Sequence, residues 1–121
     1  MWILMTLLVF GSKDWEKVAE SKLDFSSNSQ EVEMLEQEVT VNQIRLRLVS
    51  GMISGDWVVV NTPDGRFFNL EVNSPLRQGQ LSPILSLPEP TQVSSLVFFY
   101  KPMNRRAMNM PTKIEVFATR E

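Results

Sequence analysis

Neither histidine nor cysteine occurs among the 121 residues of this chain. Histidine changes charge most readily near neutral pH, so its absence removes the commonest general acid–base group and metal ligand. Without cysteine there is no thiolate nucleophile, no disulfide and no lipid-anchoring thiol. The GxSxG, HExxH and P-loop motifs are absent as well. The sequence therefore predicts a protein that is not an enzyme and that uses no cofactor or metal.

The remaining catalytic residue types form no convincing pair. Adjacent serine and lysine residues occur at Ser12/Lys13 and Ser21/Lys22, but neighbours on a strand point to opposite faces. A carboxylate pair for glycoside hydrolysis would have to come from Glu31, Glu33, Glu36 and Glu38. These acids are explained more simply as an exposed edge that resists strand-to-strand aggregation.

An oxygen-ligand site for calcium is the only metal site worth weighing. Its ligands would be Asp56, Asn61, Asp64 and Glu71, yet calcium needs six to eight converging oxygens. The spacing shows no such run, and Asp64 is accounted for by a turn. We therefore expect no metal site.

Charge and size restrict the class of protein further. Twelve basic and fourteen acidic residues give a net charge of −2, which argues against a nucleic-acid partner. The length suits one domain, and a hydrophobic content of 43% is enough for one core. Packing alone must stabilise that core, because no disulfide is available.

The N-terminus carries the only long apolar run, WILMTLLVF at residues 2–10, and the chain turns polar at Gly11. A helix of this length spans about 15 Å, roughly half the thickness of a bilayer core. We therefore expect no transmembrane span and interpret residues 1–14 as a signal-like segment, with residues 15–121 as the single domain. This interpretation predicts a periplasmic or secreted protein. No basic residue precedes the run, and a buried first strand remains the alternative.

From Trp15 onward the pattern is typical of β-structure. The clearest strand is predicted at Val41–Val49, where Ile44, Leu46 and Leu48 alternate with Arg45 and Arg47. Further strands are predicted at Trp15–Ser21, Lys22–Ser27, Gln30–Leu35, Trp57–Asn61, Arg66–Val72, Leu81–Leu87, Val93–Tyr100 and Thr112–Thr119.

The turns between these runs favour antiparallel pairing. Pro63 presets φ and Gly65 accepts positive φ, so Thr62–Gly65 predicts a hairpin. Leu81–Leu87 is punctuated by proline like an edge strand, whereas Val93–Tyr100 is apolar on both faces like a central one. About eight short strands at this spacing predict an all-β fold, a single antiparallel β-sandwich.

The order of these features resembles a known family. The series runs through Trp15, Gln30–Leu35, Ile44–Leu46, the Val60–Phe68 hairpin, Gly79 before Leu81–Leu87, Leu96–Tyr100 and Ile114–Ala118. It is similar to a family of small secreted or periplasmic bacterial β-sandwich proteins known only as a domain of unknown function. The resemblance implies a jelly-roll-like fold and export, and no activity. One departure is Pro90–Gln92, where family members often carry an arginine.

Two features are candidates for binding. The segment Met103–Met110 places Arg105 and Arg106 among three methionines, including Met108, between two prolines. Methionine adapts to irregular partners and arginine is enriched at interfaces, so this loop is the best candidate contact surface. A plain solvated connection is the simpler interpretation.

The second candidate is an aromatic group around the predicted hairpin. Trp57, Phe67 and Phe68 can form a platform for a sugar ring, but packing into the core is the favoured interpretation. We keep Trp57 as a candidate binding residue.

Two classes of function survive these observations. The first is a non-catalytic envelope or secreted module that binds a protein or glycan partner through loops at one end of the sandwich. The second is a structural or stress-related envelope protein that self-associates, and a hydrolase ranks below both. The ligand and the oligomeric state are not determined by the sequence.

Overall fold

The computed structural model describes residues 15–36 and 39–119. The predicted signal-like segment, residues 1–14, lies outside the described residues. Within them the chain forms eight strands and a short 3-10 helix, and no α-helix. The elements are β1 (Glu16–Leu23), β2 (Ser29–Glu33), β3 (Val39–Ser50), β4 (Met52–Asn61), β5 (Phe67–Arg77), β6 (Leu85–Val93), β7 (Ser95–Pro102), η2 (Arg106–Asn109) and β8 (Thr112–Thr119).

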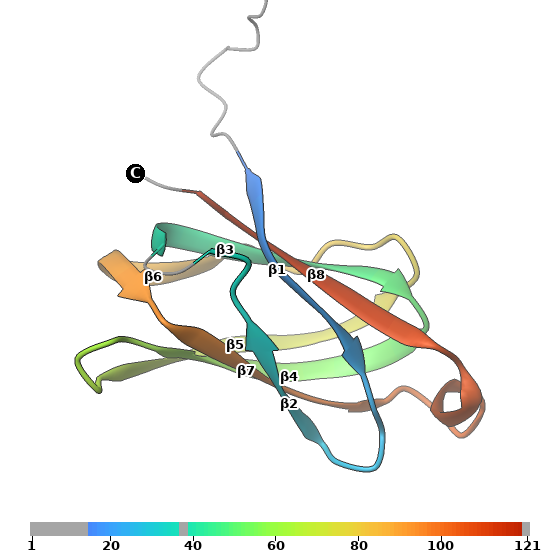
Figure 1. Ribbon diagram of the computed structural model, residues 1–121. Coiled ribbons are helices and arrows are strands. Elements are labelled where there is room, and N and C mark those ends of the chain that lie inside the picture. The colour runs from blue at the N-terminus through green and yellow to red at the C-terminus, as the bar shows by residue number, and fades with distance from the viewer. Residues whose placement is uncertain (1–14, 37–38, 120–121) are drawn as a thin grey trace, which may run out of the picture.

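The strands form two four-stranded antiparallel sheets that pack face to face (Figure 1). Sheet A has the order β1-β8-β3-β6, and sheet B has the order β2-β7-β4-β5. The pairing is nested, because β1 pairs with β8, β2 with β7, β3 with β6 and β4 with β5. The predicted all-β antiparallel sandwich is therefore confirmed.

The core lies between the sheets and follows the period-two pattern of the strands. Ile44, Leu46 and Leu48 on β3 are buried, while the intervening arginines face outward, as predicted. On the central strand β7, Leu96, Phe98 and Tyr100 point into the same core from the opposite sheet. The two sheets thus bury one continuous apolar layer, which is the main source of stability in a chain without disulfides.

The β4–β5 hairpin forms where the turn residues predict it. Gly65 has φ of +90°, and the backbone closes through Thr62 N to Arg66 O at 3.0 Å. The hydroxyl of Thr62 donates to the Asp64 carboxylate, which also receives Arg66 Nε at 3.1 Å. Asp64 therefore serves the turn, as the sequence indicates.

Several predicted strand boundaries are wrong. The predicted strands Trp15–Ser21 and Lys22–Ser27 are one strand, β1, followed by a turn. β4 begins at Met52 rather than Trp57, because the chain continues through a bulge at Gly55/Trp57. β6 begins four residues later than predicted, ends six residues later and runs past Pro88 and Pro90. The β3–β6 register shifts next to these prolines, so the ladder does not need their missing N–H groups.

Candidate functional site

Four connections gather at one end of the sandwich, which we call the loop end. They are the β1–β2, β3–β4, β5–β6 and β7–β8 connections, at residues 24–28, 51, 78–84 and 103–111. The β7–β8 connection carries η2 and stands out from the sheets at this end (Figure 1). The opposite end, which we call the hairpin end, carries the β4–β5 turn.

The β7–β8 connection is folded rather than extended. The N–H of Ala107, which is fully buried, donates to both the side-chain Oδ1 of Asn104 at 3.0 Å and its carbonyl at 3.1 Å. Met110 N donates to Ala107 O at 3.1 Å, and the Thr112 hydroxyl donates to Met110 O at 3.0 Å. These bonds fix the positions of the residues between them.

The structure places the four predicted binding residues of this loop at its surface. Arg105 and Arg106 are exposed, Met103 is half-buried, and Met108 is 53% exposed. Neither arginine takes part in an ion pair within the described part of the chain. The prediction that these side chains form a contact surface is untested, but their exposure is compatible with it.

A hollow of about 550 Å³ lies between this loop and the β1–β2 turn. Its apolar lining comes from Leu23, Phe25, Met108, Met110 and Pro111, and its polar lining from Lys22, Asp24, Ser50, Thr112 and Lys113. This size lies within the range of about 300–1,000 Å³ that is typical of small-molecule sites. The loop end therefore carries a concave site whose lining combines apolar side chains with two lysines and one aspartate.

The β1–β2 wall of the hollow is held by the only tyrosine of the chain. Asp24 N donates to the Tyr100 hydroxyl at 3.1 Å, and that hydroxyl donates to Asp24 O at 2.5 Å. The ring of Phe25 meets the Tyr100 ring edge-on at 5.8 Å. Burial raises the pKa of the Tyr100 hydroxyl, so it stays protonated and keeps donating at neutral pH. This wall is preformed.

Positive charge is concentrated at the loop end. Among the described residues, six cations lie in its connections or within one residue of the adjoining strand ends, against the single acid Asp24. The six are Lys22, Arg77, Lys101, Arg105, Arg106 and Lys113. The hairpin end, counted the same way, has the acids Glu16, Glu33, Glu36 and Asp64 against Lys17 and Arg66. The molecule thus presents opposite charge at its two ends.

Two of these cations stand side by side at the hollow. Lys22 and Lys113 are cross-strand partners in the β1–β8 pairing, where like charges destabilise a sheet. Lys113 Nζ lies 3.8 Å from Glu20 Oε1, whereas Lys22 has no ion pair in the described chain. An anion bound between them would relieve this repulsion.

Trp57 lies elsewhere, on the outer face of sheet B. The residue is 38% exposed and its ring stacks on Phe99, with ring centroids 4.9 Å apart. Phe67 is 67% exposed on the same face, whereas Phe68 packs against the core. The interpretation that Trp57 and Phe67 pack into the core is therefore wrong, because Val58 and Val60 occupy the inward positions of β4.

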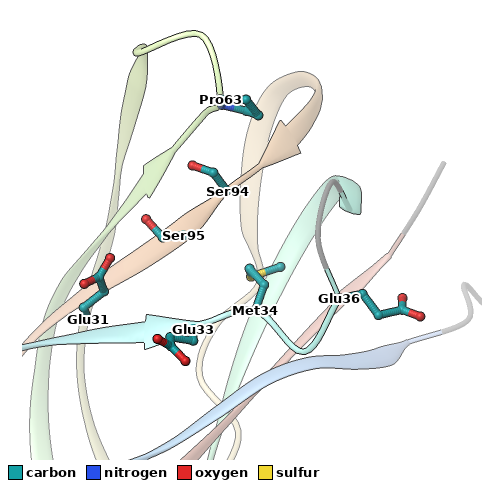
Figure 2. Close-up of a pocket in the computed structure, with 7 residues that line it drawn as sticks. All are labelled: Glu31, Glu33, Met34, Glu36, Pro63, Ser94 and Ser95. Atoms are coloured by element: carbon teal, nitrogen blue, oxygen red, sulfur yellow. The ribbon is translucent and has the colours of Figure 1, made fainter.

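The predicted acidic edge lines a second hollow, of about 520 Å³, near the hairpin end. Glu31, Glu33 and Glu36 contribute to it together with Met34, Pro63, Ser94 and Ser95 (Figure 2). Figure 2 shows the Glu36 carboxylate directed away from the other two. No group of three or more acidic, histidine or cysteine side chains in residues 15–36 and 39–119 is placed to hold a metal ion.

The Ser21/Lys22 pair is not brought together as a dyad. The Ser21 hydroxyl donates to the carbonyl of Lys22 at 3.0 Å, and Lys22 lines the hollow. Ser12/Lys13 and Glu38 lie outside the described residues. The geometry of the described chain thus offers no nucleophile–base pair among the candidates that the sequence suggested.

Two acids on the outer face of sheet A, Glu20 and Glu115, form ion pairs with neighbouring cations. Glu115 receives Arg47 Nη1 at 3.1 Å and Lys17 Nζ at 3.5 Å. Glu20 receives Lys17 Nζ at 2.8 Å, and Lys113 lies close by. The hydrogen bond from Lys17, followed by the charge of Lys113, lowers the pKa of Glu20 below its usual 4.5.

The lowered pKa of Glu20 predicts a loss of stability in acid. As pH falls below about 4.5, the unfolded state binds this proton first, so the free energy of unfolding decreases until the lower folded-state pKa is passed. We expect Glu20→Gln to flatten the curve of unfolding free energy against pH in this window. Denaturant titrations from pH 7 to 3 measure it, and an unchanged curve would contradict the ion pair.

Sequence reasoning missed half of the hollow at the loop end. Lys22 and Phe25 are some ninety residues from Lys113, and only the β1–β8 register brings them together. The alternation of lysines with apolar residues near Leu23 and Ile114 was a visible signal, but it indicates only which face each lysine occupies. Which strands pair depends on contacts between residues far apart in the sequence, and the local pattern does not show it.

Comparison with known proteins adds no relative. No family model, no curated protein and no solved structure matches this chain. The resemblance to a β-sandwich family of unknown function therefore stays a prediction. No helix in the described part of the chain is long and apolar enough to span a membrane.

Proposed function

We propose that this protein is a non-catalytic binding module whose ligand combines negative charge with an apolar group and binds at the loop end. The observation that carries this proposal is the 550 Å³ hollow in which paired lysines adjoin the exposed Met108 and the half-buried Phe25. Ammonium groups select anions, and the flexible thioethers of methionine accommodate apolar groups of varied shape. The lining therefore specifies an anionic amphiphile, either free or as part of a larger partner.

The distribution of charge supports the same ligand class. Six cations against one acid at the loop end attract an anion over a distance, although the net charge of the chain is −2. Arg105 and Arg106 lie in the same loop as the lining residues Met108 and Met110, and the hydrogen bonds of Ala107 hold the segment that carries them. The folded loop and the Tyr100 clamp reduce the ordering cost of binding.

The fold and the location complete the proposal. The nested pairing of the eight strands, first with last and inward from there, supports the jelly-roll arrangement. The apolar run at residues 2–10 supports a periplasmic or secreted location. In this setting, loops at one end of a rigid sandwich are the usual place for a binding site.

The alternative, self-association through strand edges, has less support. β6, one edge of sheet A, contains Pro88 and Pro90, and β5, one edge of sheet B, contains Pro75 and a residue with positive φ at Asn73. Prolines and local bends discourage edge-to-edge pairing. We therefore place the contact surface at the loops.

Binding of decyl phosphate tests the proposal. Calorimetric titration below the micellar concentration should show saturable binding to the wild-type protein, and Lys22→Gln/Lys113→Gln should weaken it about tenfold or more. A tenfold loss is about 1.4 kcal/mol, a modest value for charge-assisted hydrogen bonds to a phosphate. Arg105→Ala/Arg106→Ala should weaken it less, because these residues do not line the hollow.

Two controls make this result specific. Arg47→Gln/Arg66→Gln also removes two positive charges, but from residues that do not line the hollow. It should leave binding within about twofold of wild type. Inorganic phosphate should bind far more weakly than decyl phosphate, because it lacks the apolar tail. The proposal would be overturned if Lys22→Gln/Lys113→Gln bound decyl phosphate as tightly as Arg47→Gln/Arg66→Gln does. It would also be overturned if the wild-type protein showed no saturable binding.

A further inference from the structure

The outer face of sheet B carries a second surface with a different chemistry. Pairing aligns its outward side chains in rows across β2, β7, β4 and β5. From the hairpin end these rows are Glu33–Ser95–Asn61–Phe67, Glu31–Val97–Val59–Asn69 and Ser29–Phe99–Trp57–Glu71. The first row has its aromatic residue, Phe67, at the β5 end, and the other two rows have apolar or aromatic residues on β7 and β4. The remaining positions of the rows are acids, amides and serines.

The aromatic side chains on this face are not needed to fill the core. The inward positions of β4 and β7 are taken by Val58, Val60, Leu96, Phe98 and Tyr100, all of which are buried. Trp57 uses one ring face against Phe99 at an interplanar angle of 26° and remains 38% exposed. A tryptophan whose ring is fixed by stacking on a neighbour, and which is partly exposed to solvent, is a rigid apolar platform.

Acids without counter-ions lie beside this platform, on β5, and at the β2 edge of the same face. Glu71 is the cross-strand partner of Trp57, and its carboxylate receives Asn73 Nδ2 at 3.1 Å. Glu31, Glu33 and Glu71 take part in no ion pair among the described residues, in contrast to the acids of sheet A. Their oxygens are therefore available as hydrogen-bond acceptors.

The charge of this face disfavours two possible occupants. A second copy of the chain placed face to face would bring these carboxylates against one another, which is unfavourable. An anionic ligand meets the same repulsion. An uncharged sugar chain has apolar ring faces for Trp57 and hydroxyl donors for the carboxylates and for the amide of Asn69, so it matches both parts of the surface.

We propose that the outer face of sheet B, centred on Trp57 and Glu71, binds an uncharged oligosaccharide. This site is separate from the loop end, and it stands whether or not an anionic amphiphile binds there. Phe67 is 67% exposed on β5, two rows from Trp57 toward the hairpin end, and it adds a second apolar contact on the same face.

The test uses cellohexaose and chitohexaose as uncharged probes of the full chain. Titration followed by tryptophan fluorescence and calorimetry should show saturable binding of at least one of them. Trp57→Ala should weaken that binding about tenfold or more, and Phe67→Ala and Glu71→Ala should each weaken it severalfold. Trp15→Ala removes a tryptophan next to Arg45 on sheet A and should leave the affinity unchanged.

Every other outcome overturns the proposal. If neither sugar binds the wild-type protein, or if Trp57→Ala binds it as tightly, the platform does not take an oligosaccharide. Binding of pentalysine that Glu71→Ala abolishes, without sugar binding, would assign the face to a basic peptide. A dimer in sedimentation that Phe67→Ala dissociates would assign it to a second copy. Phe67→Ala also serves if Trp57→Ala does not fold, because its side chain is largely in solvent.

Discussion

Replacing Leu46 by alanine is expected to lower the free energy of unfolding by about 2–5 kcal/mol. Leu46 is 1% exposed and lies in the middle of β3, where it packs within the core between the two sheets. The truncation removes buried apolar surface and leaves a cavity that two paired sheets cannot close without shifting. Urea denaturation of the wild-type and variant proteins measures the difference.

The neighbouring arginines are the matched controls. Arg47→Ala should cost under about 1 kcal/mol, because its pair with Glu115 is at the surface. Arg45→Ala should cost slightly more, since Arg45 donates to Ser82 O at 3.2 Å and lies over the Trp15 ring. Equal costs for all three substitutions would mean that the register of β3 is wrong.

Gly51→Ala is expected to produce the second large loss of stability, about 3 kcal/mol or more. Gly51 has φ of +94°, and a Cβ there would lie 2.5 Å from the Thr112 Oγ1 atom and 3.0 Å from its Cγ2 atom. Alanine therefore adds a steric clash to the left-handed backbone cost of about 1–2 kcal/mol. Because Thr112 lines the hollow, the clash also displaces one of its walls.

Gly79→Ala separates the clash from the backbone cost. Gly79 has φ of +85°, and nothing lies within 4 Å of the position that a Cβ would take. This substitution should therefore cost only about 1–2 kcal/mol. Thermal and urea unfolding of both variants compares them directly. Equal losses of stability would show that the Thr112 side chain moves away from the new Cβ without lowering the free energy of unfolding.

The parts of the fold that were predictable from the sequence have local causes. The alternation on β3, the Pro63–Gly65 turn and the boundaries of β8 each follow from side-chain periodicity or from φ preferences within a few residues. β4 was predicted five residues too short because Gly55 and Asp56 interrupt its apolar pattern. Their place in a bulge follows from pairing with β7, which the sequence does not display.

The candidate sites also contain some features that have local causes and others that depend on strand pairing. The exposure of Arg105 and Met108 could be expected from the composition of their own loop. The orientation of Trp57 could not, because Val58, Val59 and Val60 make both faces of β4 apolar and the period of two leaves the inward face undecided. Lys22 and Lys113 meet only through the β1–β8 register, so half of the hollow required the structure.

Nuclear magnetic resonance mapping of decyl phosphate on the isotope-labelled protein tests the central claim, binding at the loop end, most directly. The account predicts saturable shift changes at the backbone amides of residues 22–25, 50, 108, 110, 112 and 113, which line the hollow. These changes should follow one dissociation constant and should be absent in Lys22→Gln/Lys113→Gln. Saturable changes confined to the outer face of sheet B or to the hairpin end, or no saturable changes, would contradict it.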